Sequence, residues 1–199
     1  MPRRAPLSKV GVFAMDPGGK TGLAWAVADL SLPNTRTILQ NLTLKDSITV
    51  EGDEYQQIKE ISQHWMKFFR DAVKEAGIHF KRVDFVSEDF IPRPSSHQQA
   101  PGKEGISPVR ILWGVEGYRL GRADEWQQRR RTKQRRLVSI PRVILQHPSQ
   151  AAGFGTSDRL RDWDLWVVGK EHERAAWKHV ALRVATLRDI RQKQGVKSK

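Results

Sequence analysis

The sequence predicts one mixed α/β domain, in which three strands lead into alternating helices and strands. Short apolar segments that end in turn residues or acids are typical of strands. Longer segments with apolar residues three and four positions apart are typical of helices, and both kinds occur along the chain. A chain of 199 residues with 38% hydrophobic and 29% charged residues is long enough for one such domain with a substantial core.

The N-terminal part predicts three strands joined by tight turns. Residues 10–16, VGVFAMD, form a short apolar segment that ends in an acid. The PGGKTG segment at 17–22 has the glycine and proline content of a turn, and residues 23–30 predict the second strand. A proline–asparagine turn precedes residues 35–44, whose alternating pattern predicts a third strand. We therefore expect an antiparallel meander.

The middle of the chain predicts a helix, a strand, a long loop and a second helix. Residues 53–77 carry a helical stripe of apolar side chains and end in a glycine, which favours a helix C-cap. The segment VDFVSED at 83–89 predicts a fourth strand that again ends in acids. Three prolines in 91–107 predict a loop, and a serine followed by a proline opens the helix expected over 107–126.

The C-terminal part predicts a strand and two helices after a basic segment. Residues 129–136 contain six basic residues in eight and predict a basic arm or helical extension. A fifth strand is expected over 142–146, a short helix over 156–166, and a long final helix from about 170 to 192.

The predicted domain organisation is simple. We expect an N-terminal tail over 1–9, a folded domain over 10–192 and a basic C-terminal tail over 193–199.

Charge and cysteine content limit the classes of function. The formal net charge is +13, which favours a polyanionic partner because basic groups at phosphates release condensed counterions. The absence of cysteine excludes disulfides, thiolate nucleophiles and cysteine-bound zinc. No apolar run is long enough to cross a bilayer and no secretory signal is recognised. We therefore expect a cytoplasmic protein with no membrane partner.

Two acids at the ends of predicted strands form a candidate metal site. Asp16 ends the first strand, and Glu88 lies at the end of the fourth. Ligand sites in α/β sheets form beyond strand ends, where side chains from different strands converge. Two carboxylates brought together there repel each other and favour a divalent cation such as magnesium. Solvated acids at the starts of loops remain the alternative interpretation.

The final helix adds a face with two histidines. His172, Ala175, Ala176 and His179 are three, four and seven positions apart, so they share one side of a helix. Small residues between two histidines leave room for a ligand to approach. A neutral histidine can bind a metal ion or orient a water molecule, although a histidine on a helix is also commonly structural.

These segments together resemble the RuvC-type Holliday junction resolvases of the RNase H-like superfamily, especially their phage-borne relatives. The resemblance rests on VFAMDPGGKTGLAWAV, VDFVSEDF and HERAAWKH, in that order. It implies an RNase H-like fold, with a mixed five-stranded sheet and helices on both faces. It also implies a homodimer that uses two Mg²⁺ or Mn²⁺ ions to nick four-way junctions in DNA recombination, in the host cytoplasm if the protein is phage-encoded.

The resemblance also assigns roles to individual residues. Asp16 and Glu88 are expected to bind the metal ions, and His172 to be a further ligand or a base near the attacking water. In these relatives the final helix reads His-x-x-Asp-Ala-x-x-His, and the position of its aspartate is occupied here by Ala175. We therefore expect the chain to be inactive or severely impaired as a nuclease.

Three explanations fit Ala175. An aspartate could have been replaced by alanine to trap an uncleaved DNA complex. Glu173 could supply the missing carboxylate, although it lies about 200° around the helix from position 175. Lastly, the protein could be a natural junction-binding protein that does not cut.

DNA contacts are expected from three basic or polar segments. They are the turn after the first strand, the long loop after Glu88 and the basic run. The candidate residues are Lys20, Arg93, Ser95, Ser96, His97, Gln98, Lys103, Arg129, Arg130, Arg131, Lys133, Arg135 and Arg136.

Two other functions stay open at this stage. One is an RNase H-like nuclease that acts on flaps, forks or RNA–DNA hybrids. The other is a branched-DNA binding protein without cleavage activity.

Overall fold

A computed structural model of the chain describes residues 8–78, 82–89, 108–131 and 143–196, with backbone only for 122–131 and 195–196. The elements alternate between strands and helices along the chain. They are β1 (Lys9–Asp16), β2 (Thr21–Asp29), α1 (Thr35–Gln40), β3 (Thr43–Val50), α2 (Glu54–Lys74), β4 (Val83–Glu88), α3 (Pro108–Arg131), β5 (Ile144–Gln146), α4 (Pro148–Phe154), α5 (Ser157–Asp162) and α6 (Glu171–Val196).

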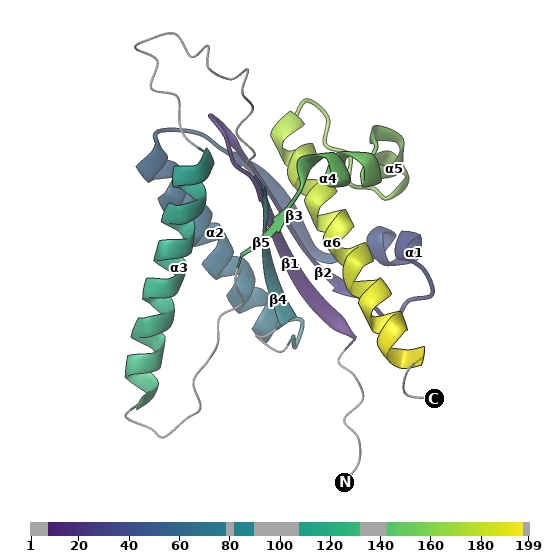
Figure 1. Cartoon of the computed structure of the whole chain (residues 1–199), viewed down its shortest axis with the longest axis horizontal. Helices are drawn as coiled ribbons and strands as arrows, with labels where there is room; N and C mark the ends of the chain where they lie inside the picture. Colours follow the sequence, from purple (N-terminus) through teal and green to yellow (C-terminus); the bar gives the residue numbers. More distant parts are fainter. Residues whose placement is uncertain (1–7, 79–81, 90–107, 132–142, 197–199) are drawn as a thin grey trace.

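The five strands form one mixed sheet with the order β3-β2-β1-β4-β5 (Figure 1). β1 pairs with β2 and β2 with β3 in antiparallel fashion, while β4 is parallel to both β1 and β5. The predicted α/β class, the meander and the parallel portion are thus confirmed. The central strand β1 is parallel to its neighbour β4, so the C-terminal ends of these two strands lie side by side.

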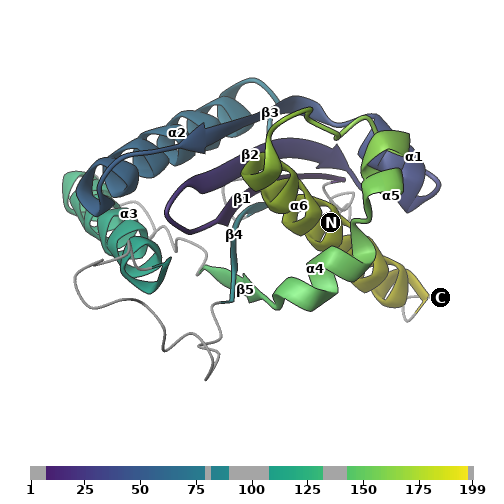
Figure 2. The same ribbon diagram turned by 90° about the horizontal axis from the view of Figure 1, so that it is seen from above.

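Helices cover both faces of this sheet, as Figure 2 shows from above. On one face, Phe13 of β1 and Phe85 of β4 pack against α2 and α3 in one hydrophobic cluster. On the other face, Val12 and Ala14 of β1 pack against α6, α1 and α5 in a second cluster. Successive residues of β1 therefore enter opposite clusters, as the strand period of two requires.

The face under α6 is lined with small side chains. Ala14, Ala24, Ala26 and Ala28 of the two central strands are all buried, and they meet Ala176 of α6 within the same cluster. Methyl-sized side chains let a helix axis approach a sheet closely. This packing fixes α6 directly above β1 and β2.

The third strand, predicted over 35–44, is wrong except at its last two residues. Residues 35–40 form helix α1, because the Asn34 side chain accepts a hydrogen bond from the backbone N–H of Thr37 and caps the helix. The strand β3 begins only at Thr43 and continues to Val50. The TRTILQ segment suits either structure by periodicity, and the cap selects the helix.

Several elements after β4 differ from the predicted bounds, including α5, which ends at Asp162 and not at 166. α3 continues to Arg131 and includes the start of the basic run, whereas residues 132–142 lie outside the described residues. α4 was not predicted; the His147 side chain caps it, and Pro148 occupies its first turn. α6 continues through 193–196, which the sequence assigns to the tail.

Within the residues described, no helix has the length and apolar character needed to cross a membrane.

Candidate metal centre

Asp16 and Glu88 lie together at one edge of the sheet, as their positions at strand ends predict. Met15 pairs with Ser87 in the parallel β1–β4 ladder, and each carboxylate is the next residue along its strand. The two side chains are close enough for a hydrogen bond between them. Their convergence confirms the geometric part of the sequence prediction.

The electrostatics of the pair are those of two acids competing for one proton. Burial raises the pKa of Asp16 to about 8, and the hydrogen bond to Glu88 and the negative charge of Glu88 add to that rise. The pKa of Glu88 is lowered, chiefly by a hydrogen bond from His179. Neither side chain is fully enclosed, with 19% and 29% of their surfaces exposed. The pair is therefore accessible to solvent, and the positive charge near it does not neutralise both carboxylates.

Helix α6 places one histidine over each acid. His172 Nδ1 lies 3.7 Å from Asp16 Oδ2, and His179 Nε2 lies 3.4 Å from Glu88 Oε2. The two histidines are seven residues, or about two helical turns, apart on one side of α6. Ala175 lies on the helix between them and is half-buried.

His179 is buried in a polar contact that the sequence did not predict. Only 2% of its side chain is exposed, and its Nδ1 atom lies 2.9 Å from Gln146 Oε1. Gln146 is the register partner of Glu88 on β5. A glutamine in a three-residue strand carries no local signal of such a role, and it could be found only from the sheet register.

Two further charged residues of α6 act on the pair. The positive charge of Lys178 lowers the pKa of both Asp16 and Glu88, while the negative charge of Glu171 raises the pKa of Asp16. Neither residue is among the site residues that the sequence predicts. Lys178 lies one turn beyond Ala175, and Glu171 one turn before it, so both flank the position where the resemblance to resolvases implies a carboxylate.

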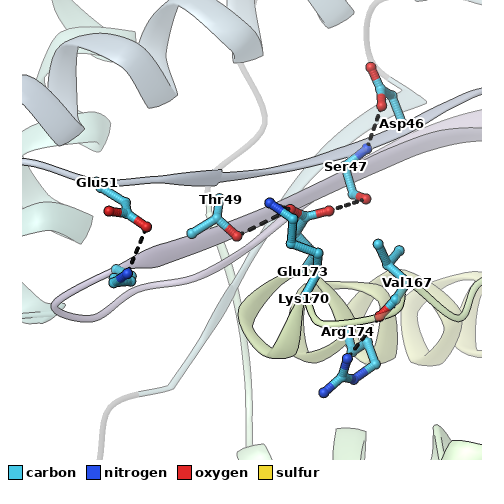
Figure 3. Close-up of polar contacts among 9 residues, drawn as sticks. Asp46, Ser47, Thr49, Glu51, Val167, Lys170, Glu173 and Arg174 are labelled. Atoms are coloured by element: carbon cyan, nitrogen blue, oxygen red, sulfur yellow. Dashed lines mark hydrogen bonds and ion pairs between the residues drawn. The ribbon is translucent and has the colours of Figure 1, made fainter.

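Glu173 does not replace that carboxylate, so this explanation of Ala175 is wrong. Its side chain is buried and accepts hydrogen bonds from Ser47 Oγ at 2.8 Å and Thr49 Oγ1 at 3.1 Å (Figure 3). Lys170 lies 3.6 Å from the same carboxylate. Glu173 therefore binds the start of α6 to β3, on the side of the helix away from position 175.

Gly22 determines how closely α6 approaches Asp16. It is the antiparallel partner of Asp16 in the β1–β2 ladder, and a Cβ atom at this position would overlap the carbonyl group of His172. The absence of a side chain lets the helix backbone rest on β2. From the sequence this glycine is predicted only as part of a turn.

We expect Gly22→Ala to destabilise the fold by about 1–3 kcal/mol, since the added methyl must displace helix backbone. The same displacement moves His172 away from Asp16. Urea unfolding measures the change, and Gly19→Ala is the matched control because a Cβ there meets nothing within 4 Å. Equal stability of the two variants would contradict this account of Gly22.

The described residues contain no group of three or more histidines and acids that could together hold a metal ion. The carboxylates at this centre are a pair, with one histidine near each. The two carboxylates are the protein ligands that this arrangement offers a metal ion, and His172 lies beside them, with Nδ1 3.7 Å from Asp16 Oδ2. Carboxylate oxygens suit Mg²⁺ and Mn²⁺, and an imidazole nitrogen favours Mn²⁺ over Mg²⁺.

The predicted DNA contacts are only partly within the described residues. Lys20 is exposed in the turn after β1 and forms an ion pair with Glu51 at 2.8 Å. The segment 129–131 forms the last turn of α3. The other candidates lie outside the described residues: Arg93, Ser95, Ser96, His97, Gln98, Lys103, Lys133, Arg135 and Arg136.

No protein-family model matches this chain, and no curated protein matches it.

Proposed function

We propose that this protein is a metal-dependent, structure-selective DNA endonuclease with an RNase H-like fold that acts on four-way junctions or other branched DNA. The observation that carries the proposal is the convergence of Asp16 and Glu88 beneath His172 of α6. The order of the sequence segments that resemble RuvC-type resolvases supports it independently. The strand order and the mixed sheet agree with the fold that this resemblance implies.

The chemistry follows from two acids that repel each other at an accessible edge. Divalent ions bound there, expected to be two Mg²⁺ or Mn²⁺ ions, would lower the pKa of a bound water and stabilise charge on a phosphodiester. Asp16 and Glu88 would hold the ions. His172, beside Asp16, would bind an ion or act as a base near the attacking water. Water is the proposed nucleophile, because the chain has no cysteine that could supply a thiolate.

The net charge of +13 supports a polyanionic substrate. Lys178 adds a positive charge beside the carboxylates themselves. A phosphate that approaches the site would therefore meet a cation on α6 in addition to any bound metal ion. These charges supply affinity for DNA, while selectivity for branched structures rests on the family resemblance.

Ala175 favours a second candidate, a branched-DNA binding protein that does not cut. The half-buried alanine stands where a third carboxylate is expected, and Glu173 points elsewhere. A missing metal ligand removes charge stabilisation that such chemistry needs. We expect the chain as it stands to bind branched DNA and to cleave it slowly or not at all.

A homodimer is part of the proposal, and helix α3 offers a surface for it. Trp113 and Leu120 are 66% and 51% exposed on one side of α3, and Gly117 lies between them with open space around it. Exposed apolar side chains on one helix face favour a protein interface. A glycine between them lets a second helix approach closely.

Trp113→Ser is expected to shift the protein from dimer to monomer, because a large exposed aromatic side chain commonly dominates binding energy in an interface. Sedimentation velocity over a range of concentrations measures the shift. Tyr55→Ser on α2, which is 75% exposed, serves as the control and should leave the dimer intact. A wild-type chain that sediments as a monomer at every concentration would contradict the dimer.

The function is tested with labelled four-way junction, flap, fork, RNA–DNA hybrid and linear duplex substrates. We expect the protein to bind the junction more tightly than the duplex at equal ionic strength, and any cleavage to require Mg²⁺ or Mn²⁺. Equal affinity for junction and duplex would contradict structure selectivity. Cleavage confined to flaps, forks or hybrids would favour the other nuclease class.

A further inference from the structure

A buried group of three polar side chains adjoins the carboxylate pair. Glu88 and Gln146 are register partners on the parallel strands β4 and β5, so their side chains leave the same face of the sheet. His179 reaches both of them from α6, with Nδ1 2.9 Å from Gln146 Oε1 and Nε2 3.4 Å from Glu88 Oε2. Gln146 is 8% exposed, and its contact with His179 is buried.

The hydrogen-bonding capacities of these groups restrict how they can be arranged. A carboxylate only accepts hydrogen bonds, so the contact between Nε2 and Glu88 is favourable only when Nε2 carries the hydrogen. In a neutral ring the Nδ1 atom is then an acceptor and needs a donor. A glutamine amide exchanges its oxygen and its amino group by a half-turn about its terminal bond, so Gln146 can supply that donor.

The side chain of Gln146 is not needed for strand pairing. Its backbone carbonyl accepts a hydrogen bond of 2.8 Å from the Asp89 N–H, which extends the β4–β5 pairing independently of the side chain. An apolar side chain of the same length could fill the space beneath α6. The polar amide is therefore best explained by its hydrogen bond with the imidazole ring of His179.

We propose that Gln146 is a positioning residue for Glu88. Its amide holds His179 in the tautomer with hydrogen on Nε2, and His179 in turn directs the Glu88 carboxylate toward Asp16. The consequence for metal binding rests on the proposed function, whereas the tautomer of His179 does not. Partners that orient metal ligands in this way typically contribute about 10–100-fold to metal affinity.

The experiment compares wild type with Gln146→Met and Gln146→Glu. Gln150→Met is the matched control, because Gln150 is exposed on the neighbouring helix α4. The tautomer of His179 is read at alkaline pH from the ¹⁵N shifts of the ring and their couplings to ring protons. Mn²⁺ affinity is measured by calorimetry on the same samples, and circular dichroism checks that each variant folds.

We expect hydrogen on Nε2 in wild type and in the control. Gln146→Glu should no longer confine it to Nε2, because each ring nitrogen then faces a carboxylate that can only accept from the ring. Gln146→Met should weaken Mn²⁺ binding by about 10–100-fold, while the control should not. If Gln146→Met fails to fold, the tautomers of wild type and Gln146→Glu still decide the matter.

Two results would overturn the positioning role. One is a wild-type ring with hydrogen on Nδ1, and the other is a hydrogen that stays on Nε2 alone in Gln146→Glu. A wild type that neither binds Mn²⁺ nor cleaves branched DNA would instead contradict the proposed function, and the tautomer measurements would still test Gln146. Failure of the two claims is therefore distinguishable.

Discussion

Ala175→Asp is expected to raise the rate of Mg²⁺-dependent junction cleavage on the order of a hundredfold or more, the usual scale for one group that stabilises charge in the transition state. Position 175 is half-buried on α6 between the histidines that contact Asp16 and Glu88. An aspartate there would add a third carboxylate to the pair. Single-turnover cleavage of a labelled junction measures the change.

The matched control for this substitution is Ala175→Asn, which has the same size but no negative charge. It should leave cleavage at the wild-type level. If aspartate and asparagine give the same rate as alanine while junction binding stays tight, the chain is better described as a branched-DNA binding protein.

Asp16→Asn is expected to abolish metal binding and yet to stabilise the metal-free protein at alkaline pH. The pKa of Asp16 is raised from 3.8 to about 8 in the folded state, chiefly by burial. The folded protein therefore holds a proton that the unfolded chain releases between these pH values, and this group's contribution to stability falls as pH rises. Asparagine carries no such charge and removes that loss.

The measurement is the melting temperature of both proteins from acid to alkaline pH in the presence of a chelator. Their difference should grow in favour of Asp16→Asn until about pH 8 and level off above it. Added Mn²⁺ should raise the wild-type melting temperature alone, because a ligand stabilises only the state that binds it. Asp189→Asn, exposed on α6, controls for loss of one charge. A constant difference across the pH range would contradict the raised pKa.

The sequence was sufficient to predict the carboxylate pair. Apolar segments that end at Asp16 and Glu88 indicate two strands, and parallel neighbours bring their C-terminal ends together. His172 followed from helical spacing alone. These predictions succeed because strand and helix periods are local properties of the chain.

The remaining features depend on register and on packing between distant segments. Gln146 contacts His179 only because β5 pairs with β4 at Glu88. Gly22 matters only because a helix from the far end of the chain rests on it. α1 was missed because the Asn34 cap outweighs a pattern that also suits a strand. No pattern within a short segment encodes the contacts of Gln146 and Gly22, whereas the Asn34 cap is a local signal, formed with Thr37 three residues later.

The alanines beneath α6 link the volume of the core to the alignment of the metal centre. Ala14, Ala24, Ala26 and Ala28 set the height of one straight helix that carries both histidines. A larger side chain at any one of these positions would displace one part of α6 from the sheet, so that one histidine moves farther from its carboxylate than the other. These alanines lie in the core, yet they constrain the geometry of the candidate metal centre. Substitutions to larger residues should therefore be tolerated least in this row of alanines.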